Sequence, residues 1–470
     1  MLHNRIRTTI FCAMASMLVT ATALAAGYDT PMLYSARNMG MGGTAIGHTD
    51  DPSSIFHNPA GLARVDGLQL MGDASPLFGT IHGSPAAKHL NIDSNLTKAP
   101  FFLVGVGYRI WDKLVVGLGV YPIASAGAGY TYTDPGSNST VDKTEDKTRL
   151  AFIEIAPSIA YEILPNLRFG VAYRASIVEF ERTVITTSAT SSFSVIDLNM
   201  IGNNYEGFRV GLQYQIKGLD IGLVYRNKIT ARVNDARKSS DPVPAVVIGQ
   251  TIDNASFTFI LPSKLGLGLH YRVSDAFRVA LDFERAFNSD NYETEVSGNQ
   301  VGNPDLVTVK NIAHWQDSLT TRVGVGYKMG DGEGRVGYVY DTQATNTLYP
   351  SAFGTPPGHT QVFTAGYGYK FNDYFDVSLA AAYRTGTGSA PAPDNKHCPF
   401  CGYAGDYSVT LFGAYFDIRY RFGGTGKAAA AVAAPVTEPT PPPTTEAAPS
   451  PAVPEKAPVP VEPAAPEAPK

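Results

Sequence analysis

Large apolar side chains alternate with polar or small ones in successive segments between about residues 66 and 422. Within residues 209–215 the even positions are apolar and the odd positions are polar or small, and the same period of two recurs in residues 277–284, 322–328 and 412–422. Because successive side chains of a strand point to opposite faces, each segment is predicted to be a strand with one apolar face.

A soluble β-sandwich also alternates in this way, so the turns between the strands are needed to separate the two classes. Tight turns alternate here with polar connections of roughly 15 to 25 residues, as short periplasmic turns alternate with long external loops in outer-membrane barrels. The tight turns are Trp111-Asp112, Lys217-Gly218, Ser274-Asp275, Gly330-Asp331-Gly332 and Asn372-Asp373. Counting gives about fourteen strands with the apolar face toward lipid, and the last strand ends on the aromatic Phe422.

The N-terminus has the pattern of an export signal. Arg5 and Arg7 precede an apolar stretch, residues 10–24, and Ala23-Leu24-Ala25 follows as a cleavage site, so residues 1–25 are predicted to be a signal peptide. Cys12 lies too early to carry a lipid. Beyond the signal no run of 18 apolar residues occurs, so any membrane crossing is expected to be by strands.

Composition and charge argue against several classes of function. The chain has 46 Gly, 25 Tyr and 23 Phe and only 17% charged residues, a composition too rich in glycine and aromatics for an ordinary helical enzyme. Removing Arg5 and Arg7 with the signal changes the formal charge from −5 to −7, which disfavours nucleic acid as a partner. No G-x-S-x-G motif is present and the nine His residues show no metal-ligand spacing, so neither catalysis, a cofactor nor a metal is expected. Gly40-x-Gly42-x-x-Ala45 fits a dinucleotide fingerprint, but no strand precedes it.

Several motifs together resemble one family. Residues 36–43, then Asp50-Asp51, then Asn58-Pro59-Ala60-Gly61-Leu62 are similar to the plug of the FadL/TodX outer-membrane hydrocarbon transporters. Residues 260–262 leading to Asp282, and residues 314–318 leading to residues 335–341, are similar to its later strands. The resemblance covers about residues 26–422. It implies an all-β, fourteen-stranded antiparallel transmembrane barrel in residues 66–422, with a small helical plug in residues 26–65 and passive transport of long-chain fatty acids or aromatic hydrocarbons.

The Asn-Pro-Ala motif has two interpretations. Pro59 excludes Asn58 from helical geometry, so Asn58, Pro59 and Ala60 are expected to form a turn in which the Asn58 amide bonds nearby backbone. A plain turn explains the residues alone. The family resemblance favours a plug that is bonded to the barrel wall.

The resemblance also assigns a position to the mature N-terminus. Tyr28 takes the place of an aromatic residue that lies near the ligand in the family. A frayed terminus is the alternative.

Pro122 interrupts a predicted third strand, residues 113–130, just before a run of small residues. A closed barrel has no free edge for a proline, so a bulge or a gap is expected there. The family has an inward kink in this strand that opens the wall sideways, and the resemblance assigns that role to Pro122. Pro157 and Pro262 also lie in strand-like segments.

Two presumed external loops are unexpectedly apolar, and exposed apolar surface usually marks a binding site. The family uses this pair of loops to capture ligand, while packing of the loops on each other is the alternative. The candidate capture residues are Phe193, Ile196, Leu198, Met200, Val246, Val247 and Ile248.

Cys398 and Cys401 are the cysteines outside the signal, and a local disulfide is expected in an oxidising compartment. A redox motif or a zinc site that includes His397 is less favoured, because the surrounding pattern and ligands are missing. Residues 423–470 are expected to form a disordered periplasmic tail, since thirteen prolines between Pro435 and Pro469 leave little that can bury a core. Contact of this tail with the cell wall or a partner is open.

The predicted function is therefore transport of hydrophobic small molecules by a monomeric barrel in the lipid bilayer of the cell outer membrane. A structural or adhesion barrel is the competing class, and a hydrophilic porin is a third. A porin is expected to lack the Asn-Pro-Ala plug and the apolar loops.

Overall fold

The computed structural model describes residues 32–85, 90–133, 143–236, 245–247, 250–301, 306–350, 357–391 and 404–423. Contacts divide the chain into two units, and the described residues belong to the first, Met1–Thr425. The predicted signal peptide, Tyr28, Ile248, both predicted disulfide cysteines and the tail beyond residue 423 lie outside the described residues. No helix in the described part of the chain is long and apolar enough to cross a membrane.

The described strands form one antiparallel sheet. They are β1 (Leu68–Gly83), β2 (Ile92–Asp93), β3 (Thr97–Trp111), β4 (Leu114–Thr133), β5 (Lys143–Leu164), β6 (Leu167–Thr187), β7 (Ser192–Ile216), β8 (Leu219–Arg226), β9 (Ile229–Asp235), β10 (Ala245–Val247), β11 (Gln250–Leu261), β12 (Lys264–Arg272), β13 (Phe277–Ala286), β14 (Glu293–Gln300), β15 (Leu306–Ile312), β16 (Ser318–Met329), β17 (Gly332–Asp341), β18 (Thr360–Lys370), β19 (Phe375–Ala390) and β20 (Gly405–Phe422).

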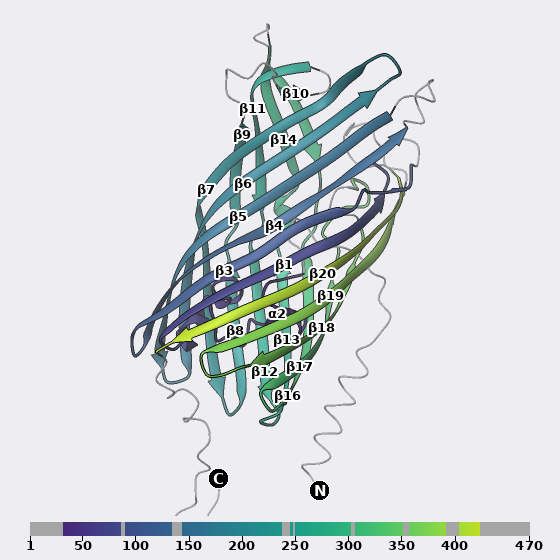
Figure 1. Ribbon diagram of the computed structural model, residues 1–470. Helices are drawn as coiled ribbons and strands as arrows, with labels where there is room; N and C mark the ends of the chain where they lie inside the picture. The colour runs from purple at the N-terminus through teal and green to yellow at the C-terminus, as the bar shows by residue number, and fades with distance from the viewer. Residues whose placement is uncertain are drawn as a thin grey trace, which may run out of the picture. The chain divides into compact units, whose positions relative to one another are not determined.

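The sheet closes on itself, because β1 pairs with both β3 and β20 (Figure 1). Four wall strands consist of two segments each, β8 with β9, β12 with β11, β13 with β14 and β16 with β15, and β2 and β10 are short additions. The described wall is thus a closed antiparallel barrel of fourteen strands, as predicted, and its last strand ends at Phe422.

The apolar faces of the strands point outward, as the sequence predicted. Leu212 and Tyr214 of β7 are exposed on the outer face, whereas Arg209 and Gln213 of the same strand are buried inside. Exposed apolar side chains are common on the other wall strands too. A lipid-facing apolar surface around a more polar interior is typical of outer-membrane barrels.

The prediction that the residues from Phe193 to Met200 lie in an external loop is wrong. Residues 192–216 form the single strand β7, which pairs with β6 from Leu167↔Tyr214 to Thr187↔Ser192. A strand of 25 residues far exceeds the roughly 9–11 residues needed to cross a bilayer, so the hairpin continues beyond it. Phe193, Ile196, Leu198 and Met200 therefore lie in a strand, and β10, which contains Val246 and Val247, pairs with it at Ile196 and Asp197.

The N-terminal segment, residues 32–65, lies within the barrel (Figure 1). Its short helices are α2 (Ala36–Met39), α3 (Ser54–His57) and the 3-10 helix η1 (Pro59–Arg64). Inward-facing glycines of the wall allow the N-terminal segment to lie close against the strands. A Cβ atom on Gly222, for example, would lie 1.9 Å from the Ile46 carbonyl oxygen. A larger residue at this position would displace the segment.

Candidate functional site

The Asn58 side chain stabilises a turn and also forms hydrogen bonds to the barrel wall. Its Oδ1 accepts a hydrogen bond from the Ala60 amide at 3.1 Å, which caps η1, and Pro59 occupies the first helical position. Its Nδ2 donates to the Ile46 carbonyl at 2.8 Å and to the Leu212 and Leu223 carbonyls of the wall at 3.2 and 3.3 Å. One fully buried amide thus satisfies the turn and connects the N-terminal segment to β7 and β8.

The N-terminal segment also contacts β4 at Pro122. The Tyr34 hydroxyl donates a hydrogen bond to the Pro122 carbonyl. The Tyr34 ring lies 4.9 to 6.1 Å from the rings of Phe56, Phe101 and Tyr121. These aromatic contacts place the segment against the inner face of β3 and β4.

The pairing between β3 and β4 ends beside Pro122. The last pair is Val104↔Val120, although β3 continues to pair with β1 as far as Thr97 and β4 continues to pair with β5 as far as Thr133. The register with β5 also shifts between Pro122 and Ala124. Residues 97–103 of β3 and 121–128 of β4 thus face each other without ladder pairs, up to the hydrogen bond that the Asn95 amide donates to the Gly129 carbonyl at 2.7 Å. We call this part of the wall the β3–β4 gap. Its role as an opening stays a prediction.

A cavity of about 570 Å³ lies at the β3–β4 gap. Leu77 and Phe101, which are buried inside the barrel, contribute to its lining. Arg149 and Ile153 of β5, which occupy outward positions, contribute as well. The lining therefore includes residues from both faces of the wall.

Apolar rings line the interior where β5, β6 and β11 meet. The rings of Phe152, Phe180, Phe257 and Phe259 contact one another with centroids 4.4 to 6.2 Å apart. The predicted capture residues Leu198 and Met200 are buried in the same apolar cluster, and Ile196 packs against it. Phe193 is exposed.

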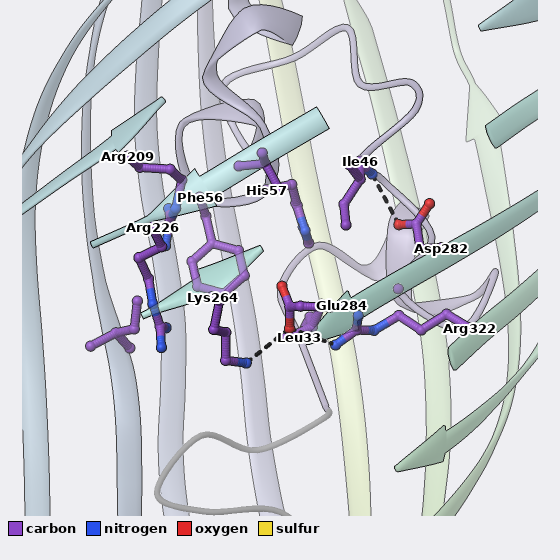
Figure 2. Close-up of a pocket in the computed structure, with 13 residues that line it drawn as sticks. Leu33, Ile46, Phe56, His57, Arg209, Arg226, Lys264, Asp282, Glu284 and Arg322 are labelled. Carbon is purple, nitrogen blue, oxygen red and sulfur yellow. Dashed lines mark hydrogen bonds and ion pairs between the residues drawn. The ribbon is translucent and has the colours of Figure 1, made fainter. Parts of the chain in front are cut away.

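A second, smaller cavity of about 40 Å³ lies against the N-terminal segment (Figure 2). Charged side chains converge on it beside Leu33 and Phe56. The charged residues in its lining are Arg209, Arg226, Lys264, Asp282, Glu284 and Arg322.

The Glu284 carboxylate holds two of these cations in place. The Lys264 Nζ lies 2.8 Å from Glu284 Oε1, and the Arg322 Nη2 lies 3.6 Å from the same oxygen. Asp282 instead accepts hydrogen bonds from the Ala45 and Ile46 amides at 2.8 and 3.0 Å. Cations in such a buried place are suited to bind a carboxylate.

Two histidines of the N-terminal segment differ in burial: His57 is buried beside this cavity, and His48 is partly buried beside Asp220. Burial lowers the pKa of His57 to about 4, and its Nε2 lies 3.0 Å from the Tyr34 carbonyl oxygen, so the neutral ring donates there. Burial, aided by the nearby charge of Arg64, lowers the pKa of His48 to about 3. Both side chains are therefore neutral at neutral pH.

The predicted residues fall into distinct places. Asn58, Pro59 and Ala60 bind the inner wall, Pro122 lies at the β3–β4 gap, and Leu198 and Met200 face the interior. The interior rings, Tyr34 and the charged residues of the small cavity were missed, because each is contributed by a strand or segment distant in sequence. One signal in the sequence could have identified the inward residues of β7. Side chains alternate between the two faces of a strand, so Leu198 and Met200 lie on one face and Asn199 and Ile201 on the other.

Comparisons with known proteins agree with this architecture. Residues 16–422 match the family described as outer membrane protein transport protein (OMPP1/FadL/TodX). No curated protein matches the chain.

Several solved structures share the fold. A Pseudomonas aeruginosa FadL homologue has 16% identity and a TM-score of 0.65, with 85% of this chain and 100% of that chain covered. The Pseudomonas putida toluene transporter TodX has 16% identity and a TM-score of 0.62, with 84% and 100% covered. The Ralstonia pickettii toluene transporter TbuX has 17% identity and a TM-score of 0.59, also with 84% and 100% covered. The chain is a barrel of the outer membrane, and it belongs to the OMPP1/FadL/TodX family of outer membrane transport proteins.

Proposed function

We propose that this protein carries small hydrophobic molecules, long-chain fatty acids or aromatic hydrocarbons, into the outer membrane and releases them sideways through the β3–β4 gap. The observation that carries this proposal is the missing pairing beside Pro122 together with the cavity whose lining includes both faces of the wall. The family supports hydrophobic transport, and two solved neighbours are named toluene transporters.

Capture begins at the outer ends of β7 and β10. Phe193 is exposed there, and Val246, Val247 and the adjacent Ile248 complete the proposed capture surface. Leu198 and Met200 then lead inward to the phenylalanine cluster. Each apolar contact removes ligand surface from water at roughly 25 cal/mol per Å², so an apolar interior attracts an apolar ligand without a charged partner.

The N-terminal segment acts as the plug in this proposal. Its bonds to the wall through Asn58 hold it across the interior, so a ligand from the phenylalanine cluster reaches the β3–β4 gap instead of the periplasm. The bond from Tyr34 to the Pro122 carbonyl connects the plug to the edge of the gap. A shift of the plug then changes the opening directly. In this proposal Tyr28, in the preceding residues, lies near the ligand.

The small charged cavity bears on the class of ligand. Arg322 and Lys264 face Glu284, and Arg322 Nε has no hydrogen-bond partner among the described residues. A fatty-acid carboxylate fits such cations, whereas an aromatic hydrocarbon does not need them. Uptake of both ligand classes by an Arg322→Met variant distinguishes the two substrates.

Uptake by two proline variants tests lateral release. Pro122→Val gives β4 a backbone N–H and a β-forming side chain at the gap, so we expect it to lower uptake of labelled toluene or oleate about tenfold or more. Pro157→Val is the matched control, because Pro157 pairs with Leu118 of β4 and the β5–β6 ladder, which omits Pro157, resumes at Ser158↔Ala172. Wild-type uptake by an assembled Pro122→Val barrel would contradict lateral release and leave a structural or adhesion role as the alternative.

Three further expectations complete the proposal. Cys398 and Cys401 form a local disulfide in an external loop, the residues after 423 extend into the periplasm, and the barrel functions as a monomer.

A further inference from the structure

Three side chains with metal-binding atoms meet between the N-terminal segment and the wall. They are His48 of the segment, Asp220 of β8 and His270 of β12, and one ligand atom from each lies within 4.8 Å of the others. Asp220 and His270 are direct partners across the β8–β12 ladder. The wall thus presents two ligands side by side, and the segment adds the third.

Among the described residues His270 makes no hydrogen bond of 3.5 Å or less that would explain its burial, and its Nδ1 lies 3.7 Å from Asp220 Oδ2. The residue is 7% exposed, yet neither of its ring nitrogens makes a hydrogen bond with any described residue. A buried polar group without a partner is costly, so such a group in a native structure calls for a ligand or another function. The His270 ring stacks on the His48 ring with centroids 4.8 Å apart, which brings two imidazoles against one carboxylate.

The distances suit a transition metal. His48 Nδ1 lies 2.8 Å and His270 Nδ1 lies 3.7 Å from Asp220 Oδ2. Ligands bound about 2.0–2.1 Å from a tetrahedral zinc ion lie roughly 3.4 Å apart, a value between these two. The other oxygen of Asp220 accepts a hydrogen bond from Arg64 Nη2 at 2.8 Å, which orients the carboxylate as outer-shell partners of metal ligands do.

We propose that His48, Asp220 and His270 form a binding site for a divalent transition metal, zinc in the first instance, that ties the N-terminal segment to the barrel wall. Two imidazoles and one carboxylate suit zinc, with water in a fourth position. Because the ligands come from the segment and from two wall strands, bound metal resists displacement of the segment. The spacing of the histidines in sequence gave no sign of this site, since 222 positions separate His48 from His270.

Calorimetric titration with zinc chloride tests the site in the full mature chain. The parent protein begins after the predicted signal peptide, which contains Cys12, and carries Cys398→Ser and Cys401→Ser, so that no thiol binds zinc. We expect one zinc per chain in this parent, and at least about tenfold weaker binding in His48→Gln and His270→Phe. His48→Gln keeps an amide donor for Asp220, and His270→Phe keeps the stacked ring, so both variants preserve the packing.

His82→Ala is the matched control, because His82 Nδ1 also lies 2.8 Å from a carboxylate, that of Asp93, but in an exposed pair that has no third ligand among the described residues. It should bind zinc as the parent does. Cobalt(II) supplies a second readout, through the intense visible absorption of tetrahedral coordination. Absence of zinc binding by the parent, or undiminished binding in both site variants, would overturn the proposal. Neither result depends on transport, so the proposed function is tested separately.

Discussion

Single residues hold the N-terminal segment at a fixed distance from the wall. Asn58 donates hydrogen bonds to β7 and β8. Asp282 of β13 accepts hydrogen bonds from the Ala45 and Ile46 amides. Gly222 leaves the space that this approach needs. The segment is therefore positioned by polar bonds and by the absence of a side chain, rather than by apolar packing alone.

Gly222→Ala should loosen the segment without preventing assembly of the barrel. The new Cβ meets the Ile46 carbonyl oxygen, which belongs to the backbone and cannot move aside as a flexible side chain does. Overpacking of this kind costs about 1–3 kcal/mol, so hydrogen exchange at the Ala45 and Ile46 amides should be roughly tenfold faster. Gly72→Ala is the control, because nothing lies within 4 Å of a Cβ at that outward position. Equal exchange in the two variants would contradict this view of Gly222.

At the level of elements, the alternation of apolar and polar residues was enough to predict the fourteen strands. It was not enough to locate the ends of β7. In residues 209–215 the apolar side chains face outward, whereas Leu198 and Met200 of the same strand face inward. Beyond the bilayer the apolar partner is the interior and not lipid, so the rule that assigns apolar residues to the outer face fails there.

The β3–β4 gap was predictable only in part. Proline removes a ladder donor, so an irregularity at Pro122 follows from the sequence. Pro157 has the same chemistry but interrupts the β5–β6 ladder over only two residues, 156 and 157, and it keeps its pair with Leu118 of β4. The residues on the far side of the gap and the cavity depend on contacts between distant strands, which no local pattern contains.

Substitutions of Met200 and of Ile201 test which face of β7 contacts the ligand during uptake. Met200→Ser removes an apolar side chain from the interior cluster, where the residue is 1% exposed, and should reduce uptake of a hydrophobic ligand several-fold by weakening its apolar contacts. Ile201→Ser changes the neighbouring outward residue, which is 46% exposed, and should leave uptake near the parent value. A reversed order of the two effects would show that the outer face of this hairpin guides the ligand.

At the level of the whole molecule, the closed sheet explains how the described barrel assembles. β1 and β20 pair from Leu68↔Phe422 to His82↔Ser408, so the first and last strands complete the ladder themselves. The described wall requires no residue after Phe422 to close.

Removal of residues 424–470 should therefore leave assembly and uptake unchanged. Migration on gels before and after boiling measures assembly, because a folded outer-membrane barrel migrates differently from the unfolded chain. Full heat-modifiability and parental uptake are expected from the truncated protein. Loss of the folded band would show that the tail contributes to assembly.

Reversible closure of the β3–β4 gap tests the central claim most directly. Ala99 of β3 and Ala128 of β4 line the same cavity, and cysteines at both positions can be joined by a bifunctional thiosulfonate in the background without Cys398 and Cys401. The control joins Ala365 and Ala381, which are paired on β18 and β19. We predict that closing the gap lowers hydrophobic uptake about tenfold or more, that a reductant restores it, and that the control link has no effect. Unchanged uptake through a barrel with a verified link across the gap would contradict lateral release and indicate a route past the N-terminal segment.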